Sequence, residues 1–230
     1  MSTVRELDNS TAWVTGAARG IGAATARSLA QRGAQVHLSD VLDCAPVAQE
    51  IEAAGGKAKA HTLDVTDRDG CRRLVDTITG DGGLDIIVCN AGVCPPGEPT
   101  GATDQWDQVM GVNLEGTRHC VDAGWDALAA SGDGRLVLVS SMAYYQGGLI
   151  VGTEYTASKA ALIGMTRHLA RNGGPLGIRC NAVAPGIIET EMTADFDKPD
   201  LERIPQRRLG TAEEVAEPIV FLCGPGSGYM

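Results

Sequence analysis

Short apolar runs alternate with longer amphipathic segments along almost the whole chain. Runs rich in β-branched and aliphatic residues predict strands at residues 11–15, 34–39, 57–63, 84–89, 135–140 and 177–183. Apolar residues at helical spacing predict helices near residues 20–32, 46–54, 67–79, 104–130, 154–170 and 211–222. Because strands that alternate with helices in this way build right-handed βαβ units, we expect a parallel sheet with helices on both faces.

The 230 residues contain no proline- or serine-rich linker, no composition shift and no fixed-period repeat. We therefore predict one doubly wound, Rossmann-type α/β domain over residues 1–230. Ligands of such sheets bind beyond the carboxyl ends of the strands. Glycine and polar residues gather at these predicted ends, in the stretches TGAARGIG (15–22), SD (39–40), DV (64–65), NAG (90–92), SS (140–141) and PG (185–186). This distribution indicates a ligand site along that edge of the sheet.

Composition and charge exclude several classes of partner. The formal net charge of −10 argues against a nucleic-acid or anionic-membrane surface, because both select basic patches. No run approaches the roughly 18 apolar residues of a membrane-spanning helix. The start, MSTVRELDNS, is too polar for a secretory signal. We expect a cytoplasmic protein that binds neither nucleic acid nor membrane.

Cysteine and histidine usage predicts neither a disulfide framework nor a metal site. The seven cysteines are an odd number and form no CxxC pair, which favours buried free thiols in a reducing compartment. The four histidines, His37, His61, His119 and His168, have no metal-ligand spacing and are interpreted as structural.

The first βα connection has the composition of a phosphate-binding loop. Gly16 suits a sharp turn, Gly20 lets backbone N–H groups approach a pyrophosphate, and Gly22 permits close packing of helix on strand. The spacing is GxxxGxG rather than GxGxxG, and a tight βα turn is the alternative interpretation. Asp40 follows Gly22 by 18 residues, at the distance where an acid binds the adenosine ribose, although a turn or N-cap role alone is also open. Together the loop and Asp40 predict a dinucleotide site.

The segment GTEYTASKA places Tyr155 four residues before Lys159 within a predicted helix. Residues four apart lie side by side on a helix, so the phenol and the ammonium group should be neighbours. Tyr and Lys are also common on solvated helix faces. This pair alone therefore does not distinguish a catalytic pair from an ordinary solvated face.

The ordered set of motifs from about residue 10 to about 223 resembles the short-chain dehydrogenase/reductase family. TGAARGIG resembles its cofactor loop, and YxxxK at Tyr155 and Lys159 its catalytic pair. The other matching positions are Asp64 and Val65, Asn90 to Gly92, Asn113 in GVNLEGT, Ser141 in VLVSS, and the segment from Asn181 to Gly186 with Thr190.

The resemblance implies a hydride transfer between NAD(H) and a secondary alcohol or ketone. Tyr155 would be the general base or acid, and Lys159 would lower the pKa of the phenol and hold the nicotinamide ribose. Ser141 would bind the substrate oxygen, and Asn113 would support a water that links Lys159 to solvent. The implied cofactor contacts are Gly16, Arg19, Gly20, Ile21, Gly22, Asp40, Asp64, Val65, Asn90, Ala91, Gly92, Tyr155, Lys159, Pro185, Gly186, Ile188 and Thr190.

The chain departs from the family pattern in two places. Ser141 precedes Tyr155 by 14 residues, one more than the family spacing, so Ser140 remains a second candidate for the serine role. The chain ends at FLCGPGSGYM, where family members continue into a final strand. We expect that strand to be missing, which puts the oligomer interface in doubt.

Aromatic and apolar residues near these motifs predict the substrate pocket. Ser141, Ala143, Tyr145 and Met192 are the candidate substrate contacts, with a second wall at 93–97. The mixed, proline-broken segment 187–208 predicts a lid in which Met192, Phe196 and Ile204 close over substrate, unless they only pin the lid. These features favour an apolar, cyclic or aromatic alcohol or ketone.

Three functions remain open. An NAD-dependent alcohol dehydrogenase is the first, and an NADPH-dependent 3-oxoacyl thioester reductase is the second, against which Asp40 argues. A non-catalytic NAD-binding protein is the third, against which the intact Ser141, Tyr155 and Lys159 argue. By resemblance we also expect a homo-oligomer, a dimer or tetramer, formed through the helices at 104–130 and 154–170.

Overall fold

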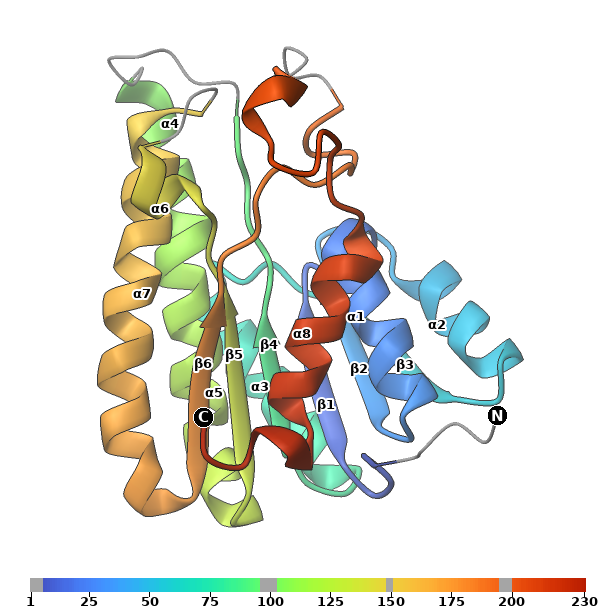
Figure 1. The fold of residues 1–230 in the computed structure, drawn as a ribbon. Coiled ribbons are helices and arrows are strands. Elements are labelled where there is room, and N and C mark those ends of the chain that lie inside the picture. The colour runs from blue at the N-terminus through green and yellow to red at the C-terminus, as the bar shows by residue number, and fades with distance from the viewer. Residues whose placement is uncertain (1–5, 96–102, 148–150, 195–199) are drawn as a thin grey trace.

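A six-stranded parallel sheet forms the centre of the molecule (Figure 1). The computed structural model describes residues 6–95, 103–147, 151–194 and 200–230. In the order of the sheet, the strands are β3 (Lys57–Thr62), β2 (Gln35–Asp40), β1 (Thr11–Thr15), β4 (Ile86–Cys89), β5 (Gly134–Val139) and β6 (Ile178–Val183). All neighbouring strands pair in parallel, which confirms the predicted strands and fold class.

Helices cover both faces of the sheet (Figure 1). One face carries α1 (Gly20–Gln31), α2 (Ala45–Ala53) and α8 (Ala212–Cys223), and the other carries α3 (Arg68–Gly80), α4 (Thr103–Met110), α5 (Thr117–Ser131) and α7 (Thr153–Gly173). In the described part of the chain, no helix is long and apolar enough to cross a membrane.

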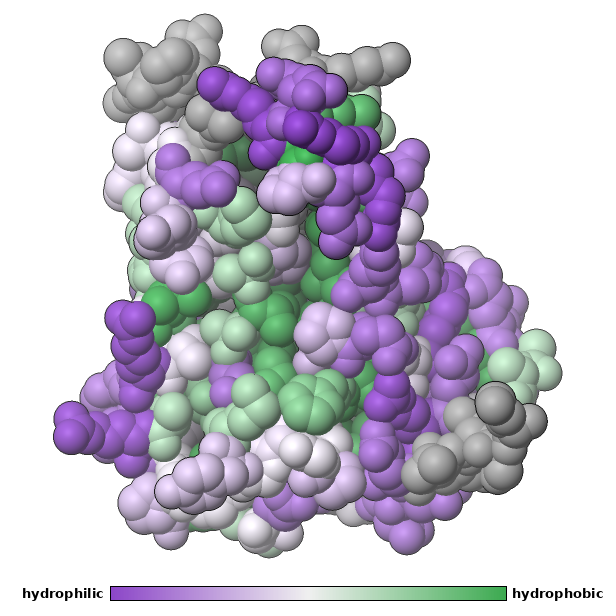
Figure 2. Space-filling model, viewed as in Figure 1, coloured by the Kyte–Doolittle hydropathy of each residue, from purple (hydrophilic) through white to green (hydrophobic). Residues whose placement is uncertain are grey.

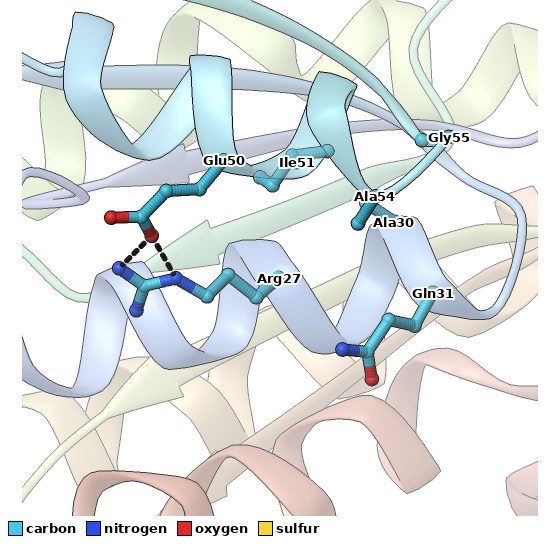
Figure 3. Close-up of a pocket in the computed structure, with 8 residues that line it drawn as sticks. Arg27, Ala30, Gln31, Glu50, Ile51, Ala54 and Gly55 are labelled. Atoms are coloured by element: carbon cyan, nitrogen blue, oxygen red, sulfur yellow. Dashed lines mark hydrogen bonds and ion pairs between the residues drawn. The ribbon is translucent and has the colours of Figure 1, made fainter.

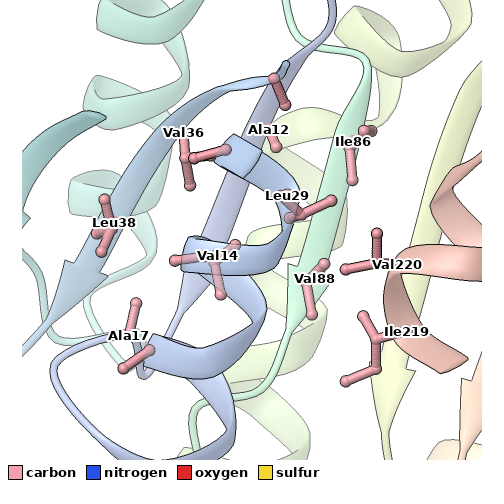
Figure 4. Packing of buried hydrophobic residues seen from close by; sticks show 14 of the residues in the cluster. Ala12, Val14, Ala17, Leu29, Val36, Leu38, Ile86, Val88, Ile219 and Val220 are labelled. Carbon is pink, nitrogen blue, oxygen red and sulfur yellow. The ribbon is translucent and has the colours of Figure 1, made fainter. Parts of the chain in front are cut away.

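The core is divided into two layers by the sheet, and β1 belongs to both. Val14 packs in the layer beneath Leu29 of α1 and Ile219 of α8 (Figure 4), whereas the adjacent Trp13 points into the layer of α3, α5 and α7. The indole of Trp13 donates a hydrogen bond to Ser39 Oγ at 2.8 Å. A strand that is buried on both faces has an almost continuous apolar sequence. This is why apolar and polar residues do not alternate along residues 11–15.

The chain order switches between β1 and β4, because β1 is paired with β2 on one side and with β4 on the other. A crevice at the carboxyl ends of the strands is expected at such a switch point. The loops that follow β1, β2, β4, β5 and β6 are therefore the place to look for a ligand site.

The helix predicted at 104–130 is interrupted. It consists of α4, a π-helical segment at Gly111–Gly116 and α5. Close packing accompanies this wider turn, since a Cβ on Gly116 would lie 2.5 Å from Val65 Cγ2. Short elements that the sequence pattern did not predict are α6 (Ala143–Gln146) and 3-10 turns at Gly174–Leu176, Leu201–Arg203 and Pro225–Ser227.

The sheet edge formed by β6 lies at the surface between α7 and α8. Apolar residues gather along this edge in the space-filling view, whereas hydrophilic residues dominate the side that carries α2 (Figure 2). Phe221 of α8 is 45% exposed and is one of the large apolar residues at the surface.

Candidate active site

The glycine loop after β1 closes tightly against the loop after β4. Gly16 and Gly20 adopt left-handed backbone angles, with φ of 64° and 54°. A Cβ on Gly16 would lie 2.7 Å from Ala91 Cα, and one on Gly22 would lie 2.1 Å from Gly16 O. Only glycine fits this packing. Ile21 packs against the core beneath the loop.

The N-terminus of α1 opens onto this loop. Its N-cap, Arg19, is extended and exposed, and its side chain makes no capping hydrogen bond. The first-turn N–H groups of a helix lack intrahelical partners and attract anions. The loop presents backbone N–H groups and the positive end of the helix dipole, which suit a pyrophosphate. The side chains of Thr190 and Glu191 approach Gly20 from the segment after β6.

Asn90 clamps the ends of β1 and β4 together. Its Nδ2 donates to Thr15 O at 3.0 Å and to Gly16 O at 2.9 Å. In return, Thr15 Oγ1 accepts from the backbone N–H of Asn90 at 3.1 Å and from that of Ala91 at 3.0 Å. The Asn90 amide group thus shapes the glycine loop, a function that the sequence interpretation as a cofactor contact had missed.

Asp40 ends β2 beside the glycine loop. Its Oδ2 accepts from the N–H of Ala18 at 3.1 Å, and its Oδ1 accepts from the N–H of Leu42 at 3.0 Å. Two backbone donors therefore fix the orientation of the carboxylate, which is only partly buried. The structure brings Asp40 next to the loop that also contains Arg19.

The side chains of Asp64 and Val65 have mainly structural roles. Asp64 Oδ1 accepts from both the N–H and the hydroxyl of Thr66, at 2.9 and 2.8 Å, and so holds the turn before α3. The Val65 side chain is 6% exposed and packs in the core. Any contact of Val65 with a cofactor would therefore come from its backbone.

Tyr155 and Lys159 lie together in the first turns of α7. Lys159 Nζ is 5.6 Å from the centre of the Tyr155 ring and donates to Val139 O at 2.9 Å. Only 4% of Lys159 is exposed, and this burial lowers its pKa to about 8. The pair therefore lies at the buried end of β5 rather than on a solvated helix face.

The pKa of Tyr155 moves opposite to the sequence-based expectation. Burial of the phenol raises its pKa to about 12, the nearby Cys94 thiol adds to the rise, and a hydrogen bond with the Ser141 side chain opposes it. Lys159 lies against the face of the ring and is not one of the groups that shift this pKa. The protein groups alone thus keep the phenol protonated, because burial outweighs hydrogen bonding.

The two candidate serines have different surroundings. Ser140 is 3% exposed, and its hydroxyl donates to Lys159 O at 2.8 Å. Ser141 is partly exposed, accepts from the N–H of Ala143 at 3.2 Å and bonds to the Tyr155 phenol. Ser141 is therefore the serine beside the reactive group, and Ser140 anchors the backbone of α7.

Asn113 is fully buried in the π-helical segment, where its amide group binds the backbone of Val93 and the side chain of Ser158. Its Oδ1 accepts from the N–H of Val93 at 2.8 Å, and its Nδ2 donates to Val93 O at 3.0 Å and to Ser158 Oγ at 3.1 Å. A Cβ on Gly92 would lie 3.2 Å from Asn113 Oδ1 and 3.4 Å from Lys159 Nζ. Gly92 thus leaves space between these two polar groups, and a water there stays a prediction.

The segment after β6 approaches the glycine loop from the other side. Pro185 O accepts from the N–H of Met142 at 2.8 Å, and a Cβ on Gly20 would lie 3.4 Å from Thr190 Cγ2. Ile188 is 9% exposed, packs in the core and pairs with Gly210 in a parallel bridge. Thr190 therefore lies beside the glycine loop and Pro185 beside the loop after β5, whereas the Ile188 side chain supports the fold. Gly186 is exposed.

The predicted substrate contacts differ in exposure. Ala143 is 9% exposed, Met192 is 41% exposed and Tyr145 is 81% exposed. Phe196 lies outside the described residues, as does part of the predicted wall at 93–97. Ala143 is thus packed away from an open pocket, whereas Tyr145 and Met192 have free surface to offer.

Cys94 belongs to the predicted pocket wall at 93–97 and is also a neighbour of Tyr155 and Lys159, which the sequence analysis did not predict. Burial raises the pKa of its thiol to about 12, with Lys159 acting against the rise and Glu154 adding to it. The sequence placed this thiol in a pocket wall and gave no sign of its closeness to Tyr155.

A surface cavity between α1 and α2 lies away from this site (Figure 3). It has a volume of about 260 Å³, and the Arg27–Glu50 ion pair at 2.7 Å spans its wall. Gly55 and Gly56 line it and directly precede β3, so the cavity lies toward the amino ends of the strands.

Comparison with known proteins gives matches over nearly the whole chain. A family model described as enoyl-(acyl carrier protein) reductase matches residues 16–230. The cis-4-hydroxycyclohexanecarboxylate dehydrogenase of Sinomonas cyclohexanicum is 39% identical over 225 residues, which are 94% of this chain and 90% of that protein. The L-rhamnose 1-dehydrogenase (NAD(P)(+)) of Azotobacter vinelandii is 37% identical over 240 residues, covering 97% of this chain and 93% of its own.

Solved structures agree with these sequence matches. The crystal structure of a 3-oxoacyl-[acyl-carrier protein] reductase with bound NAD from Brucella melitensis has a TM-score of 0.90 at 33% identity, and covers 99% of this chain and 89% of its own. The glycine loop, the Tyr155–Lys159 pair and these matches lead to one assignment. The chain belongs to the short-chain dehydrogenase/reductase family, and it is an oxidoreductase of the kind that uses a nicotinamide dinucleotide.

Proposed function

We propose that the protein is an NAD-dependent dehydrogenase of secondary alcohols, with Tyr155 as the group that takes up the hydroxyl proton. The observation that carries this proposal is the assembly of Tyr155, Lys159 and Ser141 at the strand ends that also hold the glycine loop. In the direction of ketone reduction, Tyr155 returns the same proton.

The residues divide the chemistry between them. The dinucleotide, when bound in the glycine loop, supplies the hydride acceptor and a positive charge. Ser141 donates a hydrogen bond to the substrate oxygen and stabilises the charge that develops there. Tyr155 accepts the proton from that oxygen, and Lys159 lies against its ring within the same buried space.

The raised pKa of Tyr155 sets the main electrostatic requirement of this mechanism. Lowering the pKa of the phenol from about 12 to about 8 requires roughly 5 kcal/mol of preferential stabilisation of the phenolate. Lys159 supplies it only as a cation directed at the phenol oxygen, and its own pKa of about 8 keeps it largely protonated below that pH. The positive charge of oxidised nicotinamide acts in the same direction.

Asp40 supports NAD over NADP as the cofactor. Its carboxylate is held by the N–H groups of Ala18 and Leu42 at the end of β2, where the adenosine ribose is expected. A 2′-phosphate would bring like charges together there, and among nearby side chains Arg19 is the cation that could offset this.

The exposed Tyr145 and Met192 support an apolar ring-containing alcohol or ketone as substrate. A 3-oxoacyl thioester is the second candidate, because a 33% identical 3-oxoacyl reductase was crystallised with NAD. The cofactor preference therefore does not separate the two substrate classes, and only direct assay does.

We also propose a homo-oligomer that uses α7 and the helical stretch 104–130, which contains α4, the π-helical segment and α5. Val109 of α4 and Leu162 of α7 are fully buried within the chain and contribute nothing to an interface. Leu114, Met165 and Leu169 are only partly buried, so they have surface left to bury against a second copy.

The test is to incubate the protein with NAD and a panel of cyclic secondary alcohols and to follow NADH absorbance. The reverse reaction is followed with NADH and either cyclic ketones or a 3-oxoacyl thioester. Oxidation of cyclic alcohols supports the proposal, and reduction of the thioester alone would replace it by the second candidate. Cofactor binding without any turnover would reject both.

A further inference from the structure

Ser158 is a buried hydroxyl between the catalytic tyrosine and Asn113. It lies three residues after Tyr155 on α7 and is 0% exposed. Its Oγ donates to Tyr155 O at 2.8 Å and accepts from Asn113 Nδ2 at 3.1 Å. A hydroxyl has one hydrogen, so once this is donated to Tyr155 O, Ser158 can only accept from Asn113.

This acceptor completes the hydrogen bonding of the Asn113 amide group. One Nδ2 hydrogen is bound by Val93 O, and the second is bound by Ser158. The amide oxygen is then held on the N–H of Val93, beside Gly92 and toward Lys159 Nζ. The hydrogen bonds to Ser158 and Val93 thus fit only one orientation of the Asn113 amide group. In this orientation the amide oxygen lies on the side of Lys159.

We propose that Ser158 is a positioning residue that fixes the loop after β4 relative to Tyr155 and Lys159. The proposal rests on the proposed dehydrogenase function for its effect on turnover, but its structural part does not depend on it. Through Asn113, the hydroxyl connects three separate segments, namely the first turn of α7, the π-helical segment and the backbone of Val93.

Replacing Ser158 by alanine removes this link without disturbing the helix. Alanine is the best helix former, so α7 should persist. One hydrogen of the buried Asn113 amide would then lack a partner, and buried unpaired donors are costly. The amide and the backbone it holds would shift relative to the Tyr155–Lys159 pair, and small displacements at reacting groups reduce turnover strongly.

Thr166 provides a matched control on the same helix. It is 9% exposed, and its hydroxyl donates to Leu162 O at 2.7 Å, much as Ser158 donates to Tyr155 O. No hydrogen bond from a side chain to Thr166 occurs among the described residues. Thr166→Val therefore removes a buried hydroxyl of α7 without touching Asn113.

The experiment measures two quantities on the wild type, Ser158→Ala, Ser158→Thr and Thr166→Val. The first is hydrogen exchange of the Val93 amide by NMR, which needs no catalysis. The second is kcat with the KM for cofactor. In Ser158→Ala we expect faster exchange at Val93 and a fall in kcat of about 10-fold or more with little change in KM. Thr166→Val should leave the Val93 exchange rate and kcat at their wild-type values after correction for thermal stability. Ser158→Thr should retain a higher kcat than Ser158→Ala.

The outcomes separate this inference from the proposed function. Unchanged Val93 exchange in Ser158→Ala, or equal effects of Ser158→Ala and Thr166→Val on both quantities, would overturn the role of Ser158. Faster Val93 exchange with kcat kept would show that the link exists but positions nothing, which also overturns it. A wild-type protein without dehydrogenase activity would reject the proposed function, while the exchange measurement would still report on the link.

Discussion

The carboxylate of Asp40 should make the enzyme prefer NAD to NADP. The perturbation that tests this is Asp40→Asn, which removes the charge and keeps an oxygen that can accept from the N–H of Ala18 or Leu42. The size and shape of the side chain are also kept. A change in cofactor preference would therefore come from the lost charge, together with the loss of one of the two backbone hydrogen bonds.

The magnitude follows from the position of the carboxylate. Asp40 is held at 3.1 Å from one backbone nitrogen of the glycine loop, so it cannot move away from a phosphate without losing that bond. Two unit charges 4 Å apart cost about 4 kcal/mol at an effective dielectric of about 20. Because the site is partly exposed, water and Arg19 reduce this to roughly 2–3 kcal/mol, on the order of 30- to 150-fold in preference.

The assay compares kcat/KM for NAD and NADP on one working alcohol. Asp43→Asn is the matched control, because Asp43 is exposed, carries the same charge three residues away and accepts from the N–H of Ala45 at 2.8 Å. Asp40→Asn should reduce the preference to within a few-fold of unity, and Asp43→Asn should leave it nearly unchanged. Equal use of both cofactors by the wild type would refute the reasoning, since Asp40 would then not face the ribose.

Three further outcomes test the site and the fold. Tyr155→Phe should abolish turnover and leave dinucleotide binding intact, as measured by NADH absorbance and fluorescence titration; a folded variant with near-wild-type turnover would contradict the assignment. Gly92→Ala should lower kcat about 10-fold, because the added Cβ would lie 3.4 Å from Lys159 Nζ; unchanged kcat would show that this space is not used. Burial, with the charge of its neighbour His61 adding to the effect, lowers the pKa of His37 from 6.5 to about 4, so the unfolded chain binds a proton that the folded chain refuses. The contribution of neutral His37 to the free energy of unfolding is thus complete above pH 6.5 and falls by up to about 3 kcal/mol as the pH drops toward 4. Urea unfolding at several pH values should show a smaller acid-induced decrease in the free energy of unfolding for His37→Gln than for the wild type.

The local parts of this structure could be predicted from the sequence. Strand and helix positions follow from apolar periodicity, and the approach of Tyr155 to Lys159 follows from their spacing on one helix. Asp40 beside the glycine loop follows from the rule that parallel strands end at the same edge.

The missed features depend on contacts between distant segments. The π-helical turn at Gly111–Gly116 lies inside the stretch 104–130, for which apolar spacing predicted one continuous helix. The approach of Cys94 to Tyr155 and the hydrogen bond between Ser158 and Asn113 became visible only in the fold. The pKa of Tyr155 was expected in the wrong direction because sequence spacing shows the neighbouring charge but not the burial of the phenol.

The clamp between Thr15 and Asn90 has a consequence for how the binding loop comes into being. Residues 75 positions apart must meet before the amide of Asn90 can hold Thr15 O and Gly16 O. The glycines and Asp40 all belong to the first 40 residues, but their geometry is imposed by a strand that is synthesised later. During synthesis the nascent amino-terminal half therefore has the sequence of a nucleotide site without its shape. The binding shape of the loop therefore requires that β4 is docked against β1.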